Sequence, residues 1–347
     1  MATEVTRKNM PYVRLGKSGL KVSKIILGCM SYGTPDWQGW VLDEEESLKH
    51  IKYAYDHGIN AFDTANVYSN GRSEEILGKA IKQFNMNRDE IVVLTKVYFT
   101  VARDMKLGTF AMSPAEIDAA GYVNQRGLSR KHIFESVDHS LKRLGLDYID
   151  VLQCHRFDYD TPIEETMQAL HDVVQSGKVR YIGMSSCYAW QFHAMQNYAI
   201  ANKLTPFISM QNHYNLAYRE EEREMQPTLD HFGVGCIPWS PLARGVLTRP
   251  LSQSTTRKET DQFQKGYEAP ATNAVVNRTE EVAKKIGMSM AQVSLAWVMA
   301  KTTAPIVGTT SLKNLEELIG SVNIKLSDED IKALEEPYQP RGVFGHW

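Results

Sequence analysis

The stretch Asn60–Asn70 reads NAFDTANVYSN and contains the feature that decides the fold. Two apolar residues, Ala61 and Phe62, run directly into Asp63, and Tyr68 follows five positions later. An apolar run that ends in a carboxylate is typical of a buried strand with a polar site at its carboxyl end. The rest of the chain repeats this arrangement, with further polar side chains after further apolar runs.

Eight apolar runs of strand length alternate with segments of helical period along the 347 residues. This alternation favours an α/β fold, the (β/α)₈ or TIM barrel. The alternative is a doubly wound sheet, which would usually show GxGxxG after its first strand if it held a dinucleotide. The chain has GCMSYG there, which counts against a Rossmann domain and leaves other doubly wound folds open. The predicted strands are Lys24–Leu27, Ala61–Asp63, Glu90–Lys96, Tyr148–Cys154, Val179–Met184, Ile208–Gln211, Val234–Trp239 and Pro305–Val307, and helices are predicted at Asp43–His57, Ser129–Leu144, Ile163–Gln175 and Met290–Lys301.

Residues 1–347 are interpreted as a single domain, because we find no segment of inter-domain linker character. Residues 12–22 predict a β-hairpin that closes the bottom of the barrel, with GKSG as its turn. Residues 24–336 then form the barrel and residues 338–347 a tail. Thr100–Leu128 and Leu247–Asn277 are longer than a compact barrel needs, and both follow strands at the face where barrel active sites lie.

Composition excludes several classes of protein. The net charge is −2 and no run of five Lys or Arg occurs, which argues against a broad nucleic-acid-binding surface. No stretch approaches the ~18 apolar residues of a membrane span, and the first residues lack the apolar centre of a signal peptide. The cysteines show neither CxxC nor zinc-ligand spacing, so we expect no metal site and reduced, mostly buried thiols in a cytoplasmic protein: Cys29, Cys154, Cys187 and Cys236.

Polar side chains follow three successive predicted strands. Asp63 and Tyr68 follow the second, Lys96 ends the third and His155 follows the fourth. Each alone has an ordinary explanation: a lysine after a strand is usually solvated, a histidine is often structural, and DTAN is favourable turn chemistry. Because the carboxyl ends of barrel strands meet at one mouth, the set as a whole indicates a functional site.

These four side chains suit proton transfer to a carbonyl oxygen. A tyrosine, with a pKa of ~10, is a poor acid or base near neutral pH, and a nearby lysine ammonium would lower that pKa. A buried lysine needs a partner, which Asp63 supplies, and His155 can donate a hydrogen bond to a developing oxyanion. Hydrolysis is not expected, because the sequence lacks both a GxSxG elbow and a pair of strand-end glutamates.

The chain resembles the aldo-keto reductases from the hairpin to about Glu336. The motifs that carry the resemblance occur in the order NAFDTANVYSNGRSEEILGKAI, VLTKV, YIDVLQCHRFD, YIGMSS, SMQNHYN, IPWSPLARGVL and IVGTTSLKNLEELIG. WSPLARG and LEEPYQP are most similar to the fungal aryl-alcohol dehydrogenases and versiconal-type reductases. The resemblance implies a barrel enzyme that reduces aldehydes or ketones with NADPH, less often NADH, and without a metal. It also implies that Tyr68 is the general acid. Lys96, paired with Asp63, would lower the pKa of that tyrosine, and His155 would orient the carbonyl.

The same resemblance implies where a nicotinamide cofactor lies. Ser185, Ser186 and Gln211 would hold its carboxamide, and Trp239 would stack on the nicotinamide ring. Many members of the family have asparagine where this chain has Ser186 and Leu318. Cofactor contacts are expected at Gly28, Cys29, Met30, Ser185, Ser186, Gln211, Trp239, Ser240, Leu242, Arg244, Gly245, Thr310, Ser311, Lys313, Asn314 and Glu317, with Ser311 or Lys313 near a 2′-phosphate.

The expected substrate pocket is aromatic and apolar, which favours aryl or other apolar carbonyl compounds over small sugars. Arg156 and Asp158 flank His155 and either pair with each other or reach the substrate. We expect a small-molecule substrate and neither a nucleic-acid nor a membrane partner, and the sequence does not determine the oligomeric state. The candidates for the pocket wall are Cys29, Met30, Tyr32, Trp37, Trp40, Tyr98, Phe99, Arg156 and Phe157.

An alternative within the same resemblance is a regulatory role. Potassium-channel β subunits resemble this family and sense bound nicotinamide, and they would keep the same four polar residues. A long basic N-terminal extension would favour this alternative, whereas only about eleven residues precede the hairpin here.

Overall fold

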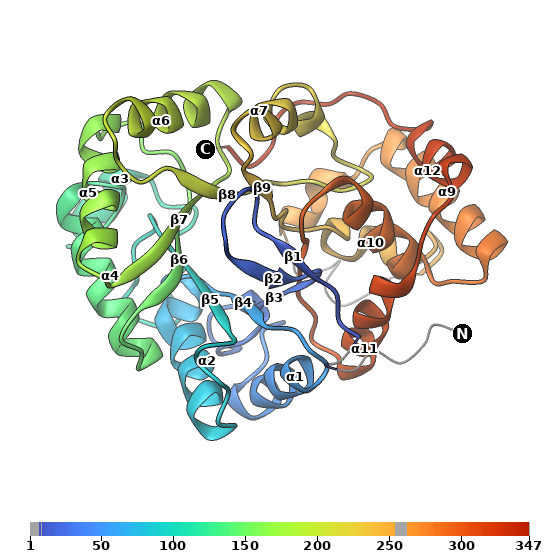
Figure 1. Cartoon of the computed structure of the whole chain (residues 1–347). Helices are drawn as coiled ribbons and strands as arrows, with labels where there is room; N and C mark the ends of the chain where they lie inside the picture. The colour runs from blue at the N-terminus through green and yellow to red at the C-terminus, as the bar shows by residue number, and fades with distance from the viewer. Residues whose placement is uncertain (1–6, 8, 254–261, 347) are drawn as a thin grey trace.

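The computed structural model describes residues 7, 9–253 and 262–346, and its centre is one parallel sheet of eight strands in the order β10-β3-β4-β5-β6-β7-β8-β9 (Figure 1). Every predicted run overlaps one of these strands, so the predicted fold class is confirmed. The bounds are β3 Ile26–Gly28, β4 Ala61–Asp63, β5 Val92–Val97, β6 Ile149–Cys154, β7 Val179–Ser185, β8 Phe207–Gln211, β9 Gly235–Cys236 and β10 Ile306–Val307.

The sheet closes into a barrel between its first and last strands. The backbone N–H of Thr303 donates to the carbonyl of Cys236 at 2.9 Å, and that of Ile306 donates to the carbonyl of Pro238 at 2.9 Å. These bonds join β10 to β9 and to the residues after it. A closed barrel leaves no sheet edge, and all eight carboxyl ends open on one face.

The predicted hairpin is present and closes the opposite end of the barrel. β1 (Tyr12–Arg14) pairs with antiparallel β2 (Lys21–Ser23), and in Figure 1 the pair crosses the centre of the barrel. Leu15 and Val22 are fully buried among barrel residues such as Leu94. The hairpin turn also lies so close to the residues before β9 that a β-carbon on Gly16 would meet the carbonyl oxygen of Gly233 at 2.4 Å.

Amphipathic helices surround the sheet (Figure 1). Asp43 and Ser129 cap α1 and α4 by accepting from backbone N–H groups, as expected of these residue types, whereas Thr161 donates to Asp158 and Pro162 precedes α5. α10 is buried on nearly all sides, as its apolar sequence predicts. The bounds are α1 Glu44–Asp56, α2 Arg72–Gln83, α3 Pro114–Ala119, α4 Arg130–Leu144, α5 Ile163–Gln175, α6 Ala189–Ala201, α7 Met225–Phe232, α9 Pro270–Ile286, α10 Met290–Lys301, α11 Leu312–Gly320 and α12 Asp328–Glu335, with short 3₁₀ turns η1 Cys29–Ser31, η2 Tyr68–Gly71, η3 Glu220–Glu222, η4 Ala243–Thr248, η5 Gln262–Tyr267 and η6 Ser321–Asn323.

The two long loops and the tail lie where the strands end. The loop 100–128 contains α3 and a small core of its own, formed by Ala102, Ile117 and Tyr122. The tail is fixed to the loop after β8, since the hydroxyl of Tyr338 donates to Glu220 at 2.6 Å. Parts of the predicted N-terminal segment, of the loop 247–277 and of the tail lie outside the described residues, namely residues 1–6, 8, 254–261 and 347.

The cysteines agree with a further expectation, that they are mostly buried thiols. All four cysteines are free, and Cys29, Cys154 and Cys187 are buried. Within the described ranges, none of the helices combines the length and the apolar character that crossing a membrane would require. The interpretation of the chain as a single domain stays a prediction.

Candidate active site

A cavity of about 850 Å³ opens at the carboxyl ends of the strands, where the sequence predicted a site. Its wall draws on the ends of β3, β4, β7 and β8, on the residues that follow β6 and β9, and on the start of α11. Most of the predicted site residues line it: Gly28, Met30, Trp40, Asp63, Tyr68, His155, Arg156, Ser185, Gln211, Trp239, Ser240, Leu242, Arg244, Gly245, Thr310, Asn314, Glu317 and Leu318.

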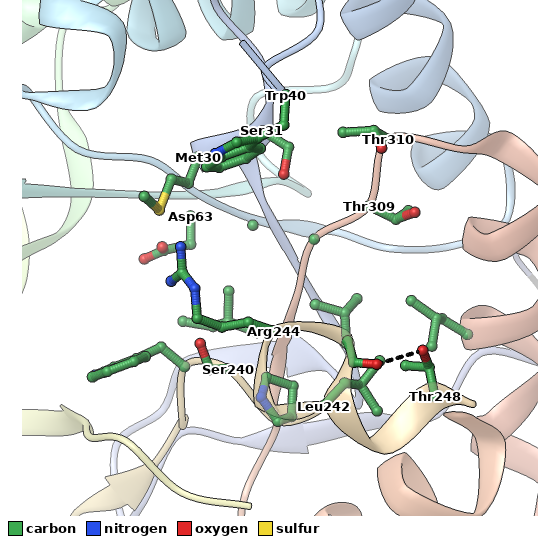
Figure 2. Close-up of a pocket in the computed structure, with 18 of the residues that line it drawn as sticks. Met30, Ser31, Trp40, Asp63, Ser240, Leu242, Arg244, Thr248, Thr309 and Thr310 are labelled. Atoms are coloured by element: carbon green, nitrogen blue, oxygen red, sulfur yellow. Dashed lines mark hydrogen bonds between the residues drawn. The ribbon is translucent and has the colours of Figure 1, made fainter. Parts of the chain in front are cut away.

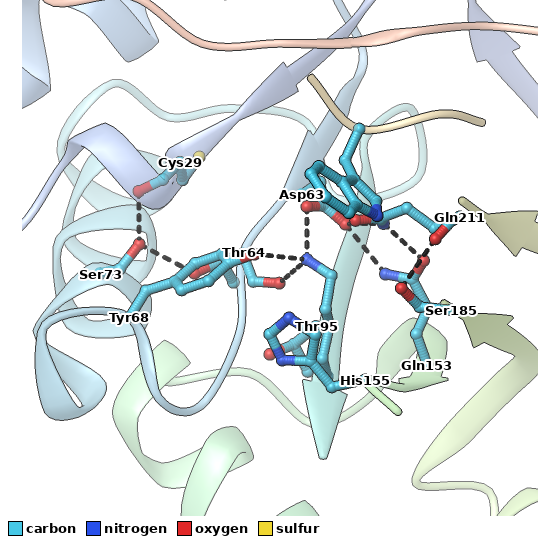
Figure 3. Close-up of polar contacts among 12 residues, drawn as sticks. Cys29, Asp63, Thr64, Tyr68, Ser73, Thr95, Gln153, His155, Ser185 and Gln211 are labelled. Atoms are coloured by element: carbon cyan, nitrogen blue, oxygen red, sulfur yellow. Dashed lines mark hydrogen bonds and ion pairs between the residues drawn. The ribbon is translucent and has the colours of Figure 1, made fainter. Parts of the chain in front are cut away.

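Lys96 does not line the cavity but joins two predicted residues that do, Asp63 and Tyr68, which Figure 3 labels. It is fully buried, and its Nζ donates to Asp63 Oδ2 at 2.5 Å, to the carbonyl of Thr64 at 2.8 Å and to Tyr68 Oη at 3.2 Å. The ammonium group therefore has three acceptors, which is the full donor capacity of a lysine. Burial of this cation is compensated by an adjacent carboxylate, as the sequence predicted.

Asp63 is held from its other side by two amides. Its Oδ1 accepts from Gln153 Nε2 and from Gln211 Nε2, each at 2.9 Å, and Gln211 Nε2 also lies 2.8 Å from Gln153 Oε1. All three side chains are buried. Two amide donors and one ammonium group therefore fix the position of the carboxylate.

The phenol of Tyr68 reaches this network because of an unusual turn after β4. Ser69 and Asn70 have φ values of 47° and 48°, a left-handed conformation that few residues other than glycine adopt. The side chain of Asn70 fixes the turn to the loop 100–128, since it accepts from the N–H of Ala102 at 3.0 Å and donates to the carbonyl of Leu107 at 3.0 Å. The loop after β5 therefore supports the turn that presents Tyr68.

Burial raises the pKa of Tyr68 above its ordinary value, although the neighbouring Lys96 lowers it. Lys96 therefore acts in the direction that the sequence predicted, and burial outweighs its effect in this structure. The pKa of Lys96 is also raised, because Asp63 and Tyr68 together outweigh the lowering effect of burial. At neutral pH the site consequently holds a neutral phenol beside an ammonium–carboxylate pair.

His155 is neutral in this environment. Burial lowers the pKa of its imidazole well below 6.5, and the positive charges of Lys96 and Arg156 lower it further. The ring meets Tyr68 edge-on, with centroids 5.7 Å apart, and its Nδ1 is buried without a hydrogen-bond partner among the described residues. A neutral imidazole beside a phenol can donate a hydrogen bond to an oxygen atom bound between them.

Trp239 forms a flat apolar surface at one end of the cavity. Its Nε1 donates to Ser186 Oγ at 3.0 Å, and its ring stacks on His213 with centroids 4.3 Å apart and planes 10° apart. His213 stacks in turn on Tyr218, at 4.1 Å and 11°. The indole is therefore fixed both in its plane and along its normal, with its remaining face toward the cavity.

Polar groups from the turn after β9 and from the segment before α11 also line the cavity (Figure 2). The turn after β9 is tight: Ser240, Arg244 and Gly245 have φ values of 50°, 56° and 98°. The side chain of Arg244 extends from this turn into the cavity in Figure 2. Thr310 lies across from it, just before α11, and an α-helix N-terminus favours anionic groups.

Some predicted site residues do not line the cavity. Cys29 and Tyr32 are fully buried in the core, since η1 turns Met30 toward the cavity and these neighbours away from it. Ser186 has a φ of 48°, and its hydroxyl accepts a hydrogen bond from Nε1 of Trp239. Ser311 caps α11, because its side chain accepts a hydrogen bond from the backbone N–H of Asn314. The remaining predicted residues outside the wall are the exposed Lys313 and the buried aromatics Trp37, Tyr98, Phe99 and Phe157.

The sequence analysis missed other residues of the wall. Phe110 comes from the loop 100–128 and packs edge-on against His155 at 6.2 Å. Arg249 follows η4, and Phe344 and Gly345 belong to the tail. The length of these segments was a signal that they carry function, but no periodicity indicated which of their side chains point inward. Further residues that the analysis did not name are Ser31, Gly39, Val41, Leu42, Pro241, Thr248, Gln253, Ala291, Ile306, Val307, Gly308 and Thr309.

Comparison with known proteins agrees with this geometry. The model of the aldo/keto reductase family matches residues 24–339. The chain belongs to this family. It is 53% identical to the versiconal hemiacetal acetate reductase of Aspergillus parasiticus over 342 residues, which cover 96% of this chain and 98% of the relative. It is 51% identical to a Schizosaccharomyces pombe protein provisionally named an aryl-alcohol dehydrogenase, with 96% and 97% covered.

A third relative is also similar along nearly its whole length. An aldo-keto reductase of Alternaria alternata is 45% identical over 342 residues, which cover 96% of this chain and 93% of the relative. The predicted similarity to fungal aryl-alcohol dehydrogenases and versiconal-type reductases is confirmed by these relatives. This aldo/keto reductase is therefore an oxidoreductase, of a family that typically uses nicotinamide cofactors.

Proposed function

We propose that this family member reduces aldehydes and ketones to alcohols with NADPH, and that Tyr68 is the proton donor. The observation that carries the proposal is the position of Lys96, whose ammonium contacts both Asp63 and the phenol oxygen of Tyr68 beneath the cavity. An ion pair in contact with a phenol suits a group that must give up its proton and take it back during the reaction.

The residues of the cavity fit a nicotinamide dinucleotide. Trp239 offers a flat surface for an aromatic ring, while Arg244, Arg249 and the N-terminus of α11 supply positive charge or N–H donors for phosphates. Gln211 uses its amide N–H₂ on Asp63 and Gln153, so its carbonyl oxygen would accept from the carboxamide. When bound, the cofactor supplies the hydride. NADPH is favoured over NADH by the family resemblance, and NADH remains an alternative.

The chain's own residues would move the proton. The raised pKa of Tyr68 keeps its phenol protonated at neutral pH, so it can donate to a carbonyl oxygen that becomes negative. Neutral His155 would hydrogen-bond the same oxygen. The charge left on the phenolate would be stabilised by Lys96, which itself stays bound to Asp63.

The substrate side of the cavity supports aryl or other apolar carbonyl compounds. Trp40, Phe110 and Phe344 contribute aromatic surface, and Met30 and Leu42 contribute aliphatic surface. Pockets of this composition bind apolar molecules and use a few polar groups to orient them. A cytoplasmic location and the absence of nucleic-acid and membrane partners stay predictions.

The test is steady-state oxidation of NADPH with 4-nitrobenzaldehyde by the parent and by Tyr68→Phe. We expect turnover by the parent and a loss of kcat of about 10²-fold or more in the variant, because a general acid contributes at least this much. Tyr198→Phe is a matched control, since it removes the same hydroxyl from α6, outside the cavity wall, and should act like the parent.

Two results would contradict parts of this proposal. A Tyr68→Phe variant as active as the parent would show that the phenol of Tyr68 is not the proton donor. A parent that binds NADPH, measured by fluorescence, but reduces none of a set of aryl aldehydes would favour the regulatory alternative.

A further inference from the structure

Arg156 is a cation in the wall of the cavity that no acidic side chain in the described part of the chain neutralises. Its Nη1 donates to the main-chain carbonyl of His155 at 2.7 Å, and its Nε is buried without a hydrogen-bond partner in the described residues. The side chain lines the same cavity as Tyr68 and His155. The residue is partly buried, and a partly desolvated charge without an ionic partner is still costly, so a position that keeps one indicates a role for it.

The carboxylates nearest to Arg156 along the chain and in the site have other partners. Asp158 accepts from the backbone N–H of Leu128 at 2.6 Å and from the hydroxyl of Thr161 at 2.7 Å. Asp63 is engaged by Lys96 and two glutamines. The structure therefore does not contain the Arg156–Asp158 ion pair that the sequence left open.

One aromatic ring, that of Phe99, lies against the guanidinium group of Arg156 without neutralising its charge. Arg156 lies over the ring of Phe99 at 5.5 Å, and Arg126 lies over the same ring at 5.5 Å and over Tyr98 at 5.2 Å. Two cations thus share one phenyl ring, whose quadrupole attracts them weakly. Burial lowers the pKa of Arg156 to about 10, so the group remains protonated at neutral pH.

Arg156 differs from Lys96, the other cation beside Tyr68, in having no carboxylate partner among the described residues. Lys96 and Asp63 cancel each other, and His155 is neutral. Arg156 adds one positive charge beside the position where a carbonyl group would meet Tyr68. A guanidinium group binds carboxylates and similar oxyanions particularly well, because several of its N–H donors lie in one plane.

We propose that Arg156 selects carbonyl substrates that carry an anionic oxygen group, a carboxylate or a phenolate, by forming an ion pair with that group. This inference rests on the proposed function and narrows its substrate class from apolar carbonyls to acidic aryl carbonyls. The apolar wall would hold the aryl ring, and Arg156 would neutralise the anion.

A structural role is the competing explanation. The bond from Arg156 to the carbonyl of His155 could serve only to hold the backbone after β6. A purely structural arginine would affect acidic and neutral substrates equally, whereas a specificity residue would affect acidic substrates alone. The experiment therefore compares substrates that differ only in charge.

The probes are 3- and 4-carboxybenzaldehyde, each compared with its methyl ester, because the structure does not fix where on the ring the acid lies. For at least one isomer we expect the parent to prefer the acid in kcat/KM. In Arg156→Met, KM for that acid should rise about 10- to 100-fold, the effect of losing one charge-assisted hydrogen bond, while values for the ester change less than threefold. Arg156→Lys should restore part of the preference, because it keeps the charge.

A binding measurement separates this inference from the proposed function. Calorimetry with benzoate, in the presence of NADP, requires no turnover, and we expect binding by the parent that Arg156→Met weakens about tenfold or more. If benzoate binding depends on Arg156 while no carbonyl is reduced, Arg156 is an anion-binding residue and the proposed reaction falls. Equal losses for acid and ester in Arg156→Met, or no preference for either acid in the parent, would overturn the inference.

Discussion

At the scale of single residues, the site depends on opposing effects at Tyr68. Burial and the charge of Asp63 raise the pKa of this phenol, and Lys96 lowers it through its charge and a hydrogen bond of 3.2 Å. Because the effects are of opposite sign, removing either charged neighbour should move the pKa in a known direction. The alcohol-oxidation direction reports that pKa, since it needs the phenolate as a base.

Lys96→Met should raise the pKa of Tyr68 further, because burial and Asp63 remain while the largest opposing effect, that of Lys96, is lost. The rate of NADP-dependent oxidation of 4-nitrobenzyl alcohol should fall by about 10²-fold or more at neutral pH and recover only at more alkaline pH than in the parent. The measurement is the pH profile of kcat. Asp63→Asn is the matched variant, since it removes the negative charge and should shift the same profile toward lower pH. Shifts in the same direction for both variants would contradict this account.

The residues at strand ends could be predicted, and those on irregular turns could not. Asp63, Lys96 and His155 follow from the alternation of strands and helices, because parallel strands of a barrel end at one face. Cys29 and Met30 are adjacent on a short 3₁₀ turn, and only the three-dimensional turn decides which of them reaches the cavity. Ser186 faces away from the cavity because of a left-handed backbone conformation that its sequence does not indicate.

At the scale of elements, helix α2 packs unusually close to α4. A β-carbon on Gly78, in the middle of α2, would lie 2.1 Å from the carbonyl oxygen of Leu144, at the end of α4. Glycine in a helix interior normally reduces stability, so its presence here reflects the close approach. The same two helices are joined by a buried ion pair, with Arg143 Nε 2.6 Å from Glu74 Oε2.

Gly78→Ala should therefore destabilise the protein even though alanine favours helices. We expect a loss of about 1–3 kcal/mol in the free energy of unfolding, because the added methyl group meets rigid backbone. Urea denaturation followed by circular dichroism measures this loss. Lys82→Ala, at an exposed position of the same helix, is the control and should be nearly neutral. A Gly78→Ala variant as stable as the parent would show that α2 can move away from α4.

At the scale of the whole molecule, the C-terminal tail completes the wall of the cavity. Phe344 and Gly345 line it, and the terminal ring atoms of Trp239 lie 3.1 Å from where a β-carbon on Gly345 would stand. The backbone N–H of Phe344 donates to the hydroxyl of Tyr218 at 3.1 Å, which places the tail over the stack of Tyr218, His213 and Trp239. The far end of the chain thereby contributes to a site built mainly by the barrel.

Truncation of the chain before Arg341 should weaken binding at the site with little effect on folding. Burial of a phenylalanine side chain is worth about 1.5–3 kcal/mol, so loss of Phe344 should raise KM for an aryl aldehyde about tenfold or more. Steady-state kinetics and thermal unfolding of the truncated chain test this. Val343→Ser is the control, because Val343 is 49% exposed in the same segment and does not line the cavity. An unchanged KM after truncation would exclude a role of the tail in binding.

The positions of the hairpin and the tail also determine which end of the chain is better suited to a fusion tag. Arg7, near the start of the chain, forms an ion pair of 2.5 Å with Glu90 just before β5, at the end of the barrel that the hairpin closes. The tail ends at the opposite face, beside the cavity. An affinity tag or fluorescent fusion placed at the C-terminus would start next to the entrance and would compete with ligands for that space. Arg7, the first residue that the structure describes, lies on the far side of the barrel, so the assays proposed above should use N-terminal fusions.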